Sequence, residues 1–260
     1  MIELQNVCYS YENGTALDNI NLQIKKGEAV ALMGPNGSGK STLLKLINGL
    51  ISPDSGTYLL DQEPITRKKL KDDKFAKLLH QKIGFVFQNS DTQLFCSNVY
   101  DEIAFGPRQM GFEEGEVEKR VLDCLDLLGI RDFKDRVPYH LSGGEKRKVA
   151  IACVLSLNPE VLVLDEPMNG LDPKTQRWLV GFLEELNQAG KTLITSTHNL
   201  ELVQELSKRA ILFDETHTVA ADRPTEELLA DIPLLKRVNL VDEYYHSHEG
   251  ENHRHYHDHR

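Results

Sequence analysis

The chain has 260 residues, of which 40% are hydrophobic and 27% are charged, and its formal net charge is −10. This length suffices for one large domain or for a domain that carries a smaller inserted lobe. The negative charge disfavours a nucleic-acid partner, and no apolar run approaches the roughly 20 residues that a membrane-spanning helix needs. The four scattered cysteines form neither a disulfide scaffold nor a zinc motif. We therefore expect a globular protein of the cytoplasm.

Strand patterns dominate the first 33 residues. Apolar and polar side chains alternate over residues 2–24, which predicts strands with one buried face. Residues 29–33 form a continuous apolar run, as expected of a strand that is buried on both faces. A glycine-rich loop follows this run, and residues 40–50 then have the pattern of a helix.

Strand and helix patterns alternate through the rest of the chain. After a charged and exposed stretch at 61–82, short apolar runs predict three strands, at 83–87, 161–164 and 192–195. Helical periodicity is clear in two places, from 113 to 128 and from 178 to 186. The basic run at 146–148 is typical of one solvated turn of a helix.

This alternation favours an α/β fold with a mostly parallel sheet and an antiparallel β segment at its N-terminal end. The segment from about 89 to 157 is mainly helical, so we expect it to form an inserted helical lobe. Residues 1–240 would make one domain. Residues 241–260 lack periodicity and are rich in histidine, and we expect them to form a flexible tail.

A phosphate-binding loop connects the apolar run at 29–33 to the helix that begins at Lys40. The loop matches the pattern G-x-x-x-x-G-K-[ST], and its nine residues are the predicted nucleotide-binding set: Gly34, Pro35, Asn36, Gly37, Ser38, Gly39, Lys40, Ser41 and Thr42. Glycines let successive N–H groups point at phosphate oxygens, and the helix N-terminus adds positive charge. Lys40 would bridge the phosphates, and the Ser41 hydroxyl would bind Mg²⁺. The α/β core is therefore predicted to be a P-loop NTPase.

Two adjacent carboxylates, Asp165 and Glu166, follow the apolar strand at 161–164. In P-loop NTPases an acidic residue at the end of a buried strand helps to hold Mg²⁺, and we assign this role to Asp165. Glu166 is placed to act as the general base for the attacking water. Without the phosphate-binding loop, the same pair would serve equally well as a turn and a helix start.

A second glycine-rich segment opens a helix at Ser142-Gly143-Gly144-Glu145. A helix N-terminus with two preceding or initial glycines can cradle an anion. A simple N-cap by Ser142 would explain the serine but not the two glycines together with the phosphate-binding loop.

With these motifs, residues 1–222 closely resemble the ATPase subunits of ABC transporters. The resemblance implies that Ser142–Glu145 is the signature segment, which acts on ATP bound to the other subunit. It also implies that Tyr11 stacks on adenine, that Gln88 contacts Mg²⁺ and the attacking water, and that His198 contacts the γ-phosphate. Taken alone, Tyr11 would be an ordinary strand aromatic, and a histidine at a strand end is more often structural.

Residues 88–95 and 99–107 resemble the energy-coupling-factor importers, in which this segment faces a coupling protein in the membrane. The tail adds six histidines to this interpretation: His246, His248, His253, His255, His257 and His259. Imidazoles mixed with carboxylates suit Ni²⁺ and Co²⁺, although a merely solvated tail explains the composition almost as well.

The combined interpretation is an ATP-hydrolysing subunit, with ATP and Mg²⁺, of a cobalt or nickel importer on the cytoplasmic face of the cell membrane. Its expected partners are a second ABC ATPase subunit (identical or a paralogue), a transmembrane coupling protein and a substrate-binding membrane protein. A vitamin importer or an exporter remains an alternative within transport. A non-transport ABC ATPase is disfavoured because the chain has one copy of each motif and no heptad run.

Overall fold

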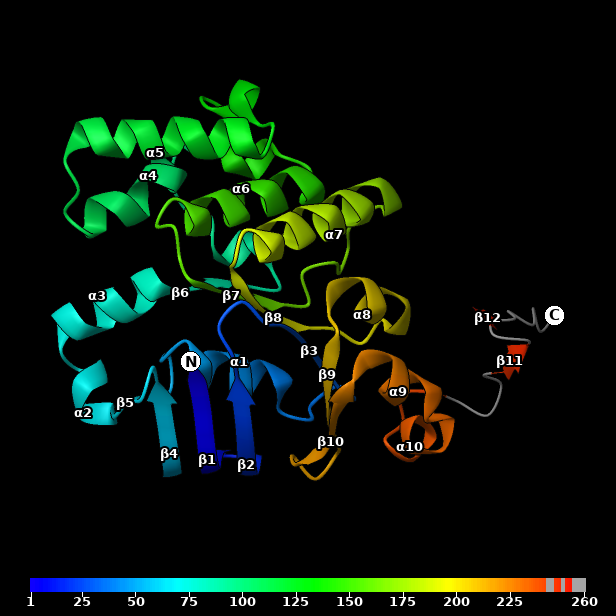
Figure 1. Cartoon of the computed structure of the whole chain (residues 1–260). Helices are drawn as coiled ribbons and strands as arrows, with labels where there is room; N and C mark the ends of the chain where they lie inside the picture. The colour runs from blue at the N-terminus through cyan, green and yellow to red at the C-terminus, as the bar shows by residue number, and fades with distance from the viewer. Residues whose placement is uncertain (242–245, 249–250, 254–260) are drawn as a thin grey trace.

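The computed structural model describes residues 1–241, 246–248 and 251–253, and Figure 1 shows how their elements are arranged. The N-terminal segment forms a sheet with the strand order β2-β1-β4-β5, in which all neighbours run antiparallel. Its strands are β1 (Ile2–Tyr11), β2 (Gly14–Ile24), β4 (Ser55–Leu60) and β5 (Glu63–Pro64). Apolar side chains at alternate positions give this sheet its buried face.

The central sheet has six strands in the order β10-β9-β3-β8-β7-β6. All neighbours run parallel except β10, which pairs antiparallel with β9 at one edge. The strands are β3 (Ala29–Met33), β6 (Ile83–Val86), β7 (Val161–Asp165), β8 (Thr192–Ser196), β9 (Arg209–Phe213) and β10 (Val219–Pro224). The run at 29–33 is buried almost throughout, as a strand covered on both faces should be.

An inserted lobe separates β6 from β7, although these two strands are neighbours in the sheet. The insertion holds η1 (Ser90–Thr92), α4 (Val99–Gln109), α5 (Glu114–Leu127), η2 (Arg131–Phe133), η3 (Pro138–His140) and α6 (Gly143–Leu155). Figure 1 shows α4, α5 and α6 gathered above the central sheet, opposite the antiparallel one. The predicted fold class, an α/β core with an antiparallel β segment and an inserted helical lobe, is therefore confirmed.

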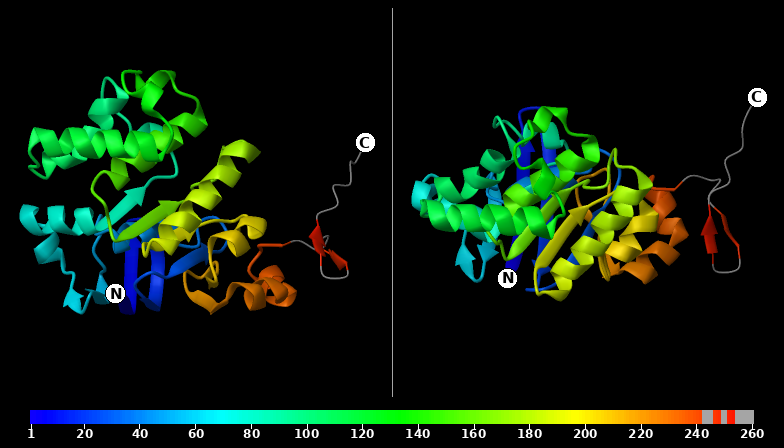
Figure 2. Two further views of the ribbon diagram at one scale, coloured as in Figure 1. Left: turned by 45° about the horizontal axis from the view of Figure 1, so that its top comes forward. Right: turned by 90° about the horizontal axis from the view of Figure 1, so that it is seen from above.

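The remaining helices cover the two sheets. They are α1 (Lys40–Ile47), α2 (Arg67–Leu70), α3 (Asp73–Lys82), α7 (Pro173–Gln188), α8 (Leu200–Leu206), α9 (Thr225–Ala230) and α10 (Ile232–Arg237). One apolar core lies between the antiparallel sheet, α1 and the central sheet, and a second joins the inserted lobe to β7 and α7. A third lies under α8, α9 and α10, which Figure 2 shows on the side away from the lobe. Within the described ranges, no helix is both long and apolar enough to cross a membrane.

The charged stretch at 61–82 is more ordered than its composition indicates. It contains α2 and α3, whose first turns are capped by the side chains of Thr66 and Asp72. Leu79 of α3 is buried and lies next to Gly49, where a Cβ would meet the Leu79 side chain at 2.6 Å. The sequence pattern did not indicate these short helices, because charged side chains on their outer face outnumber the few apolar residues that pack against the core.

Residues in the tail form a small two-stranded pairing of β11 (His246–His248) with β12 (Glu251–His253). Three of the six tail histidines lie on these strands, and His255, His257 and His259 lie outside the described residues. The predicted metal-binding tail therefore stays a prediction.

Candidate nucleotide-binding site

Four parallel strands of the central sheet end at one edge, and each is followed by a residue that the sequence singles out. The phosphate-binding loop follows β3, and Gln88 comes two residues after β6. Asp165 ends β7, Glu166 follows it, and His198 comes two residues after β8. The carboxyl ends of neighbouring parallel strands share one edge of a sheet, so residues far apart in the sequence meet there.

The phosphate-binding loop is closely packed, and two of its glycines are required by that packing. Gly39 has φ 107°, and a Cβ at this position would lie 2.3 Å from the carbonyl oxygen of Ala16. A Cβ on Gly34 would lie 2.7 Å from the carbonyl oxygen of Phe213. The loop therefore holds its backbone in a conformation that other residues disfavour, and the first amides of α1 have no acceptor within the helix itself.

Lys40 is 6% exposed, and its ammonium lies inside the loop. Its Nζ donates to the carbonyl oxygens of Gly34 at 2.7 Å and Pro35 at 2.8 Å. Burial lowers the pKa of Lys40, against the opposing effect of the nearby Glu166 and Asp165 carboxylates. The loop contains a second buried polar group, the hydroxyl of Ser38, which has no hydrogen-bond partner among the described residues.

The Asp165 carboxylate joins the loop to the neighbouring strands. Its Oδ1 accepts from the hydroxyl of Ser41 at 2.9 Å and from that of Ser196 at 2.7 Å. The Ser196 hydroxyl in turn accepts from the amide of Glu166 at 2.9 Å. Ser196 is fully buried, so it orients both acidic residues from the adjacent strand. We did not predict this role. The only signal was a hydroxyl side chain at the end of an apolar strand.

Glu166 and His198 form a pair at the mouth of the site. Glu166 Oε2 lies 2.9 Å from Nδ1 of His198, and the Glu166 backbone has a left-handed φ of 44°. A non-glycine residue in this region is uncommon and is often found at functional sites. The Glu166 side chain is 11% exposed, whereas His198 is more than half exposed.

A cavity of about 240 Å³ brings most of these residues together. Its walls come from the loop, from the ends of β6 and β7 and from the segment after β8: Asn36, Gly37, Gly39, Lys40, Ser41, Thr42, Gln88, Glu166, Asn169 and His198. Gly34, Pro35 and Ser38 stand behind this wall and shape the loop through the contacts described above. The cavity is polar and combines a cation (Lys40), a carboxylate (Glu166) and hydroxyls, as a site for a phosphate ester and a metal ion requires.

Two predicted groups do not reach this cavity. Tyr11 ends β1, is 43% exposed and makes an edge-to-face contact with Tyr9 at 5.0 Å between ring centroids. The signature segment lies at the start of α6, where Ser142 and Glu145 form a reciprocal capping box. The amide of Ser142 donates to Glu145 Oε2 at 2.7 Å, and this bond lowers the pKa of Glu145. Ser142 and Gly143 are exposed.

The basic run after the signature segment is not the solvated turn that its composition predicts. Lys146 forms an ion pair with Asp91 at 2.7 Å, and Lys148 lies over the ring of Trp178 at 4.3 Å from its centroid. Arg147 is only 3% exposed. The prediction was wrong for Arg147 because the helix turns this side chain toward the end of β6 rather than toward solvent.

A family model described as ABC transporter matches residues 17–169, which span the phosphate-binding loop, the signature segment and Asp165–Glu166. The chain belongs to the ABC transporter family. It is an ATP-binding and ATP-hydrolysing subunit of a transporter, as the motifs predicted.

Individual proteins similar to this ABC ATPase fit that assignment. A nickel import ATP-binding protein, LarO, from Lactiplantibacillus plantarum is 50% identical over 88% of this chain and 95% of its own. The structure of cbiO1 from Clostridium perfringens, part of the ABC transporter complex cbiONQ, is 38% identical with a TM-score of 0.79 over 92% of this chain and 94% of its own. A dimeric ATP-binding cassette in a post-hydrolysis state with ADP and phosphate is 33% identical, with a TM-score of 0.78 over 86% of this chain and 99% of its own.

Proposed function

We propose that this ABC ATPase drives a nickel or cobalt importer of the energy-coupling-factor type from the cytoplasmic face of the membrane. The observation that carries the ATPase part is the cavity at the sheet edge, where Lys40, Ser41 and Glu166 line one space and the Asp165 carboxylate accepts from the Ser41 hydroxyl. Support for the transported metal comes from the similarity to a nickel import ATPase and from the histidine-rich tail. Support for the transporter type comes from the segments at 88–95 and 99–107.

The donor set at Ser41 and Asp165 fits Mg²⁺. The two oxygens lie 2.9 Å apart, so they point at one place, and Mg²⁺ prefers hydroxyl and carboxylate oxygens. The amide oxygen of Gln88, which also lines the cavity, is a third candidate ligand. When bound there, Mg²⁺ would neutralise phosphate charge and orient the γ-phosphoryl group. Ser196 supports this donor set by holding Asp165 from behind.

The remaining groups of the cavity suit hydrolysis by positioning and charge stabilisation. The loop amides and Lys40 would hold the phosphates, with Lys40 exchanging its two carbonyl acceptors for phosphate oxygens. Glu166 would accept the proton of the attacking water as general base. His198, whose Nδ1 lies 2.9 Å from Oε2 of that carboxylate, would contact the γ-phosphate, and Tyr11 would stack on adenine from the end of β1.

Replacing Glu166 tests the catalytic assignment. Glu166→Gln keeps the size of the side chain and the phosphate cradle but removes the base, so ATP should still bind while hydrolysis falls about 10²–10⁴-fold. The matched control is Glu201→Gln, an exposed glutamate at the start of α8 that does not line the cavity. If the Glu166→Gln protein hydrolyses ATP at the wild-type rate in the assembled transporter, Glu166 is not the general base.

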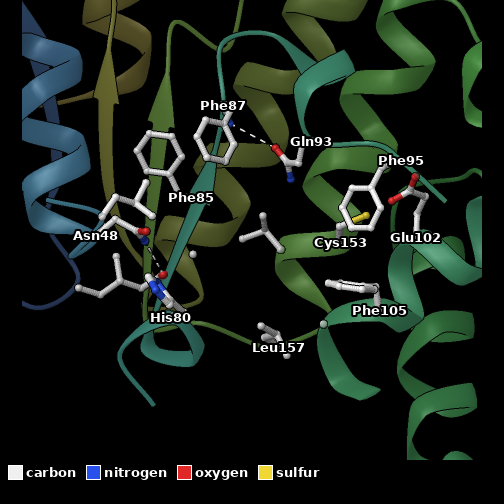
Figure 3. Close-up of a pocket in the computed structure, with 15 residues that line it drawn as sticks. Asn48, His80, Phe85, Phe87, Gln93, Phe95, Glu102, Phe105, Cys153 and Leu157 are labelled. Carbon is white, nitrogen blue, oxygen red and sulfur yellow. Dashed lines mark hydrogen bonds between the residues drawn. The ribbon is translucent and has the colours of Figure 1, made fainter. Parts of the chain in front are cut away.

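A second cavity, of about 330 Å³, suits the membrane coupling protein (Figure 3). It lies between α3, β6, α4 and α6, and Figure 3 shows mainly aromatic and aliphatic side chains around it. Phe95 and Phe105 meet edge to face at 4.9 Å at its rim and are 67% and 42% exposed. Exposed aromatic side chains beside an apolar hollow are typical of a protein-binding surface. We place a helix of the coupling protein there.

The matching experiment places a charge in this second cavity. Phe105→Asp should abolish co-purification with the membrane proteins and leave ATP binding intact, because Phe105 does not line the nucleotide cavity. Leu127→Asp is the control, since it is an exposed apolar residue on the outer face of α5. Normal assembly of the Phe105→Asp protein would move the docking surface elsewhere.

A further inference from the structure

Arg147 of α6 is a buried, charged residue that has no role in the proposed steps of ATP hydrolysis. Its guanidinium donates to two successive backbone carbonyls, that of Phe87 at 2.6 Å and that of Gln88 at 2.6 Å. It is the only arginine among the buried residues that the structure describes, and no carboxylate within the described ranges pairs with it. Burial accordingly lowers the pKa of Arg147. Burying an unpaired charge is costly, so this arrangement is a poor choice if its only purpose is to stabilise the fold.

A second side chain fastens the same backbone to the same helix. The amide of Phe87 donates to Oε1 of Gln93 at 3.3 Å, a bond drawn in Figure 3, and Nε2 of Gln93 donates to the carbonyl oxygen of Ala150 in α6 at 2.9 Å. Lys146 of α6 adds the ion pair with Asp91. The segment that leaves β6 is thus tied by three side chains to residues 146–150 of α6, which make up about one helical turn.

The two ends of this connection are functional. Gln88 lines the nucleotide cavity of this chain, immediately after the point where the chain leaves the central sheet. Arg147 lies four residues, about 6 Å along the axis, beyond the helix start at Gly143 in the signature segment. A shift of α6 must therefore move the backbone at Gln88 or break both hydrogen bonds of the guanidinium.

We propose that Arg147 is a positioning residue that makes Gln88 follow the signature helix. In this way a nucleotide held against Ser142–Glu145 in the subunit interface sets where Gln88 lies in the chain's own site. The proposal rests on the proposed roles of Gln88 and of the signature segment. Arg147 itself does not line the nucleotide cavity, and both terminal nitrogens of its guanidinium donate to the two carbonyls.

The test is a double-mutant cycle between Arg147→Met and Gln88→Ala, measured as ATP hydrolysis by the full chain in its assembled transporter. Methionine keeps the length of the side chain and removes the fork. We expect Arg147→Met to lower kcat about tenfold with little change in KM, and to have no further effect when Gln88 is already alanine, because residues that act through one another are not additive. Arg147→Lys should recover only part of the loss, since a single ammonium cannot hold both carbonyls in the same fork geometry.

The matched control is Arg120→Met. Arg120 also donates to a backbone carbonyl at the end of α6, that of Ser156 at 2.8 Å, but it lies far along the helix from Gln88. This variant should leave hydrolysis unchanged. If Arg147→Met does not fold, Arg147→Lys enters the same cycle in its place.

If Arg147→Met lowers kcat by the same factor in the wild-type and Gln88→Ala backgrounds, the proposal is overturned. Two residues that act independently have multiplicative effects on the rate, as expected of a purely structural role for Arg147. Unchanged hydrolysis by folded Arg147→Met would overturn it as well. These outcomes differ from failure of the proposed function, which would appear as unimpaired hydrolysis by Glu166→Gln or as transport of a different solute.

Discussion

Two glycine-bearing segments open helices in this chain, and they differ in where their contacts lie. The phosphate-binding loop before α1 is enclosed by its own chain, with Lys40 buried and Ser41 bonded to Asp165. The signature segment before α6 is exposed at Ser142 and Gly143, and a Cβ on Gly143 would meet nothing within 4 Å. One segment finds its partners within the chain, whereas the other is left facing outward. A pair of subunits, each completing the other's site, explains both.

The largest effect is expected from damage to the enclosed segment. Lys40→Ala should weaken ATP binding about a hundredfold, because hydrogen bonds from a charged donor contribute roughly 1.5–3 kcal/mol each. Lys45→Ala is the control, since Lys45 lies in the last turn of the same helix and does not line the cavity. Equilibrium binding of a fluorescent ATP analogue measures the difference. Equal affinity in the two variants would mean that Lys40 does not hold phosphate.

Damage to the outward-facing segment should have a different result. Ser142→Arg should preserve the affinity of the chain's own loop for ATP and lower hydrolysis at least about tenfold, because bulk and charge would enter the proposed interface. Ser55→Arg, an exposed serine on the antiparallel sheet, controls for the added charge. Parallel binding and turnover assays separate the two effects. Loss of ATP binding by Ser142→Arg would show that the two segments are not independent within one chain.

Most of the site was predictable because its residues belong to local patterns. The run at 29–33, the loop after it and the carboxylates after residue 164 each combine a buried strand with a polar end, and the structure places all three at one sheet edge. Local pattern also predicted α5, with Gly129 in a left-handed conformation just after it.

The remainder depends on contacts between distant residues. Ser196 matters because β8 lies beside β7, and no local pattern fixes that pairing. In the sequence, Arg147 is one of three consecutive basic residues. Its burial depends on contact with Phe87, which lies 60 residues earlier in the chain. The helices at 67–70 and 73–82 depend on caps and on a few apolar contacts that the surrounding charges conceal.

Removing the tail is expected to have the smallest effect on ATP binding and hydrolysis. Truncation after Leu240 should leave ATP hydrolysis unchanged and the free energy of unfolding within about 0.5 kcal/mol, since both glycine-bearing segments are retained.

The full chain should bind Ni²⁺ through its six tail imidazoles, and this binding should weaken as the pH falls through about 6, because imidazole must be neutral to bind a metal. Calorimetric titration of both forms measures this. Equal Ni²⁺ binding by the truncated chain would exclude the tail as the site.

The central claim is that the outward-facing signature segment completes the nucleotide site of another subunit. Sedimentation of the Glu166→Gln protein with and without ATP and Mg²⁺ tests it most directly, because blocked hydrolysis preserves the ATP-bound state. The account predicts ATP-dependent pairing, either between copies of this chain or with a paralogous subunit in the assembled transporter, and loss of this pairing when Ser142→Arg is added. A protein that stays monomeric at saturating ATP, both alone and with its membrane partners, would contradict the account.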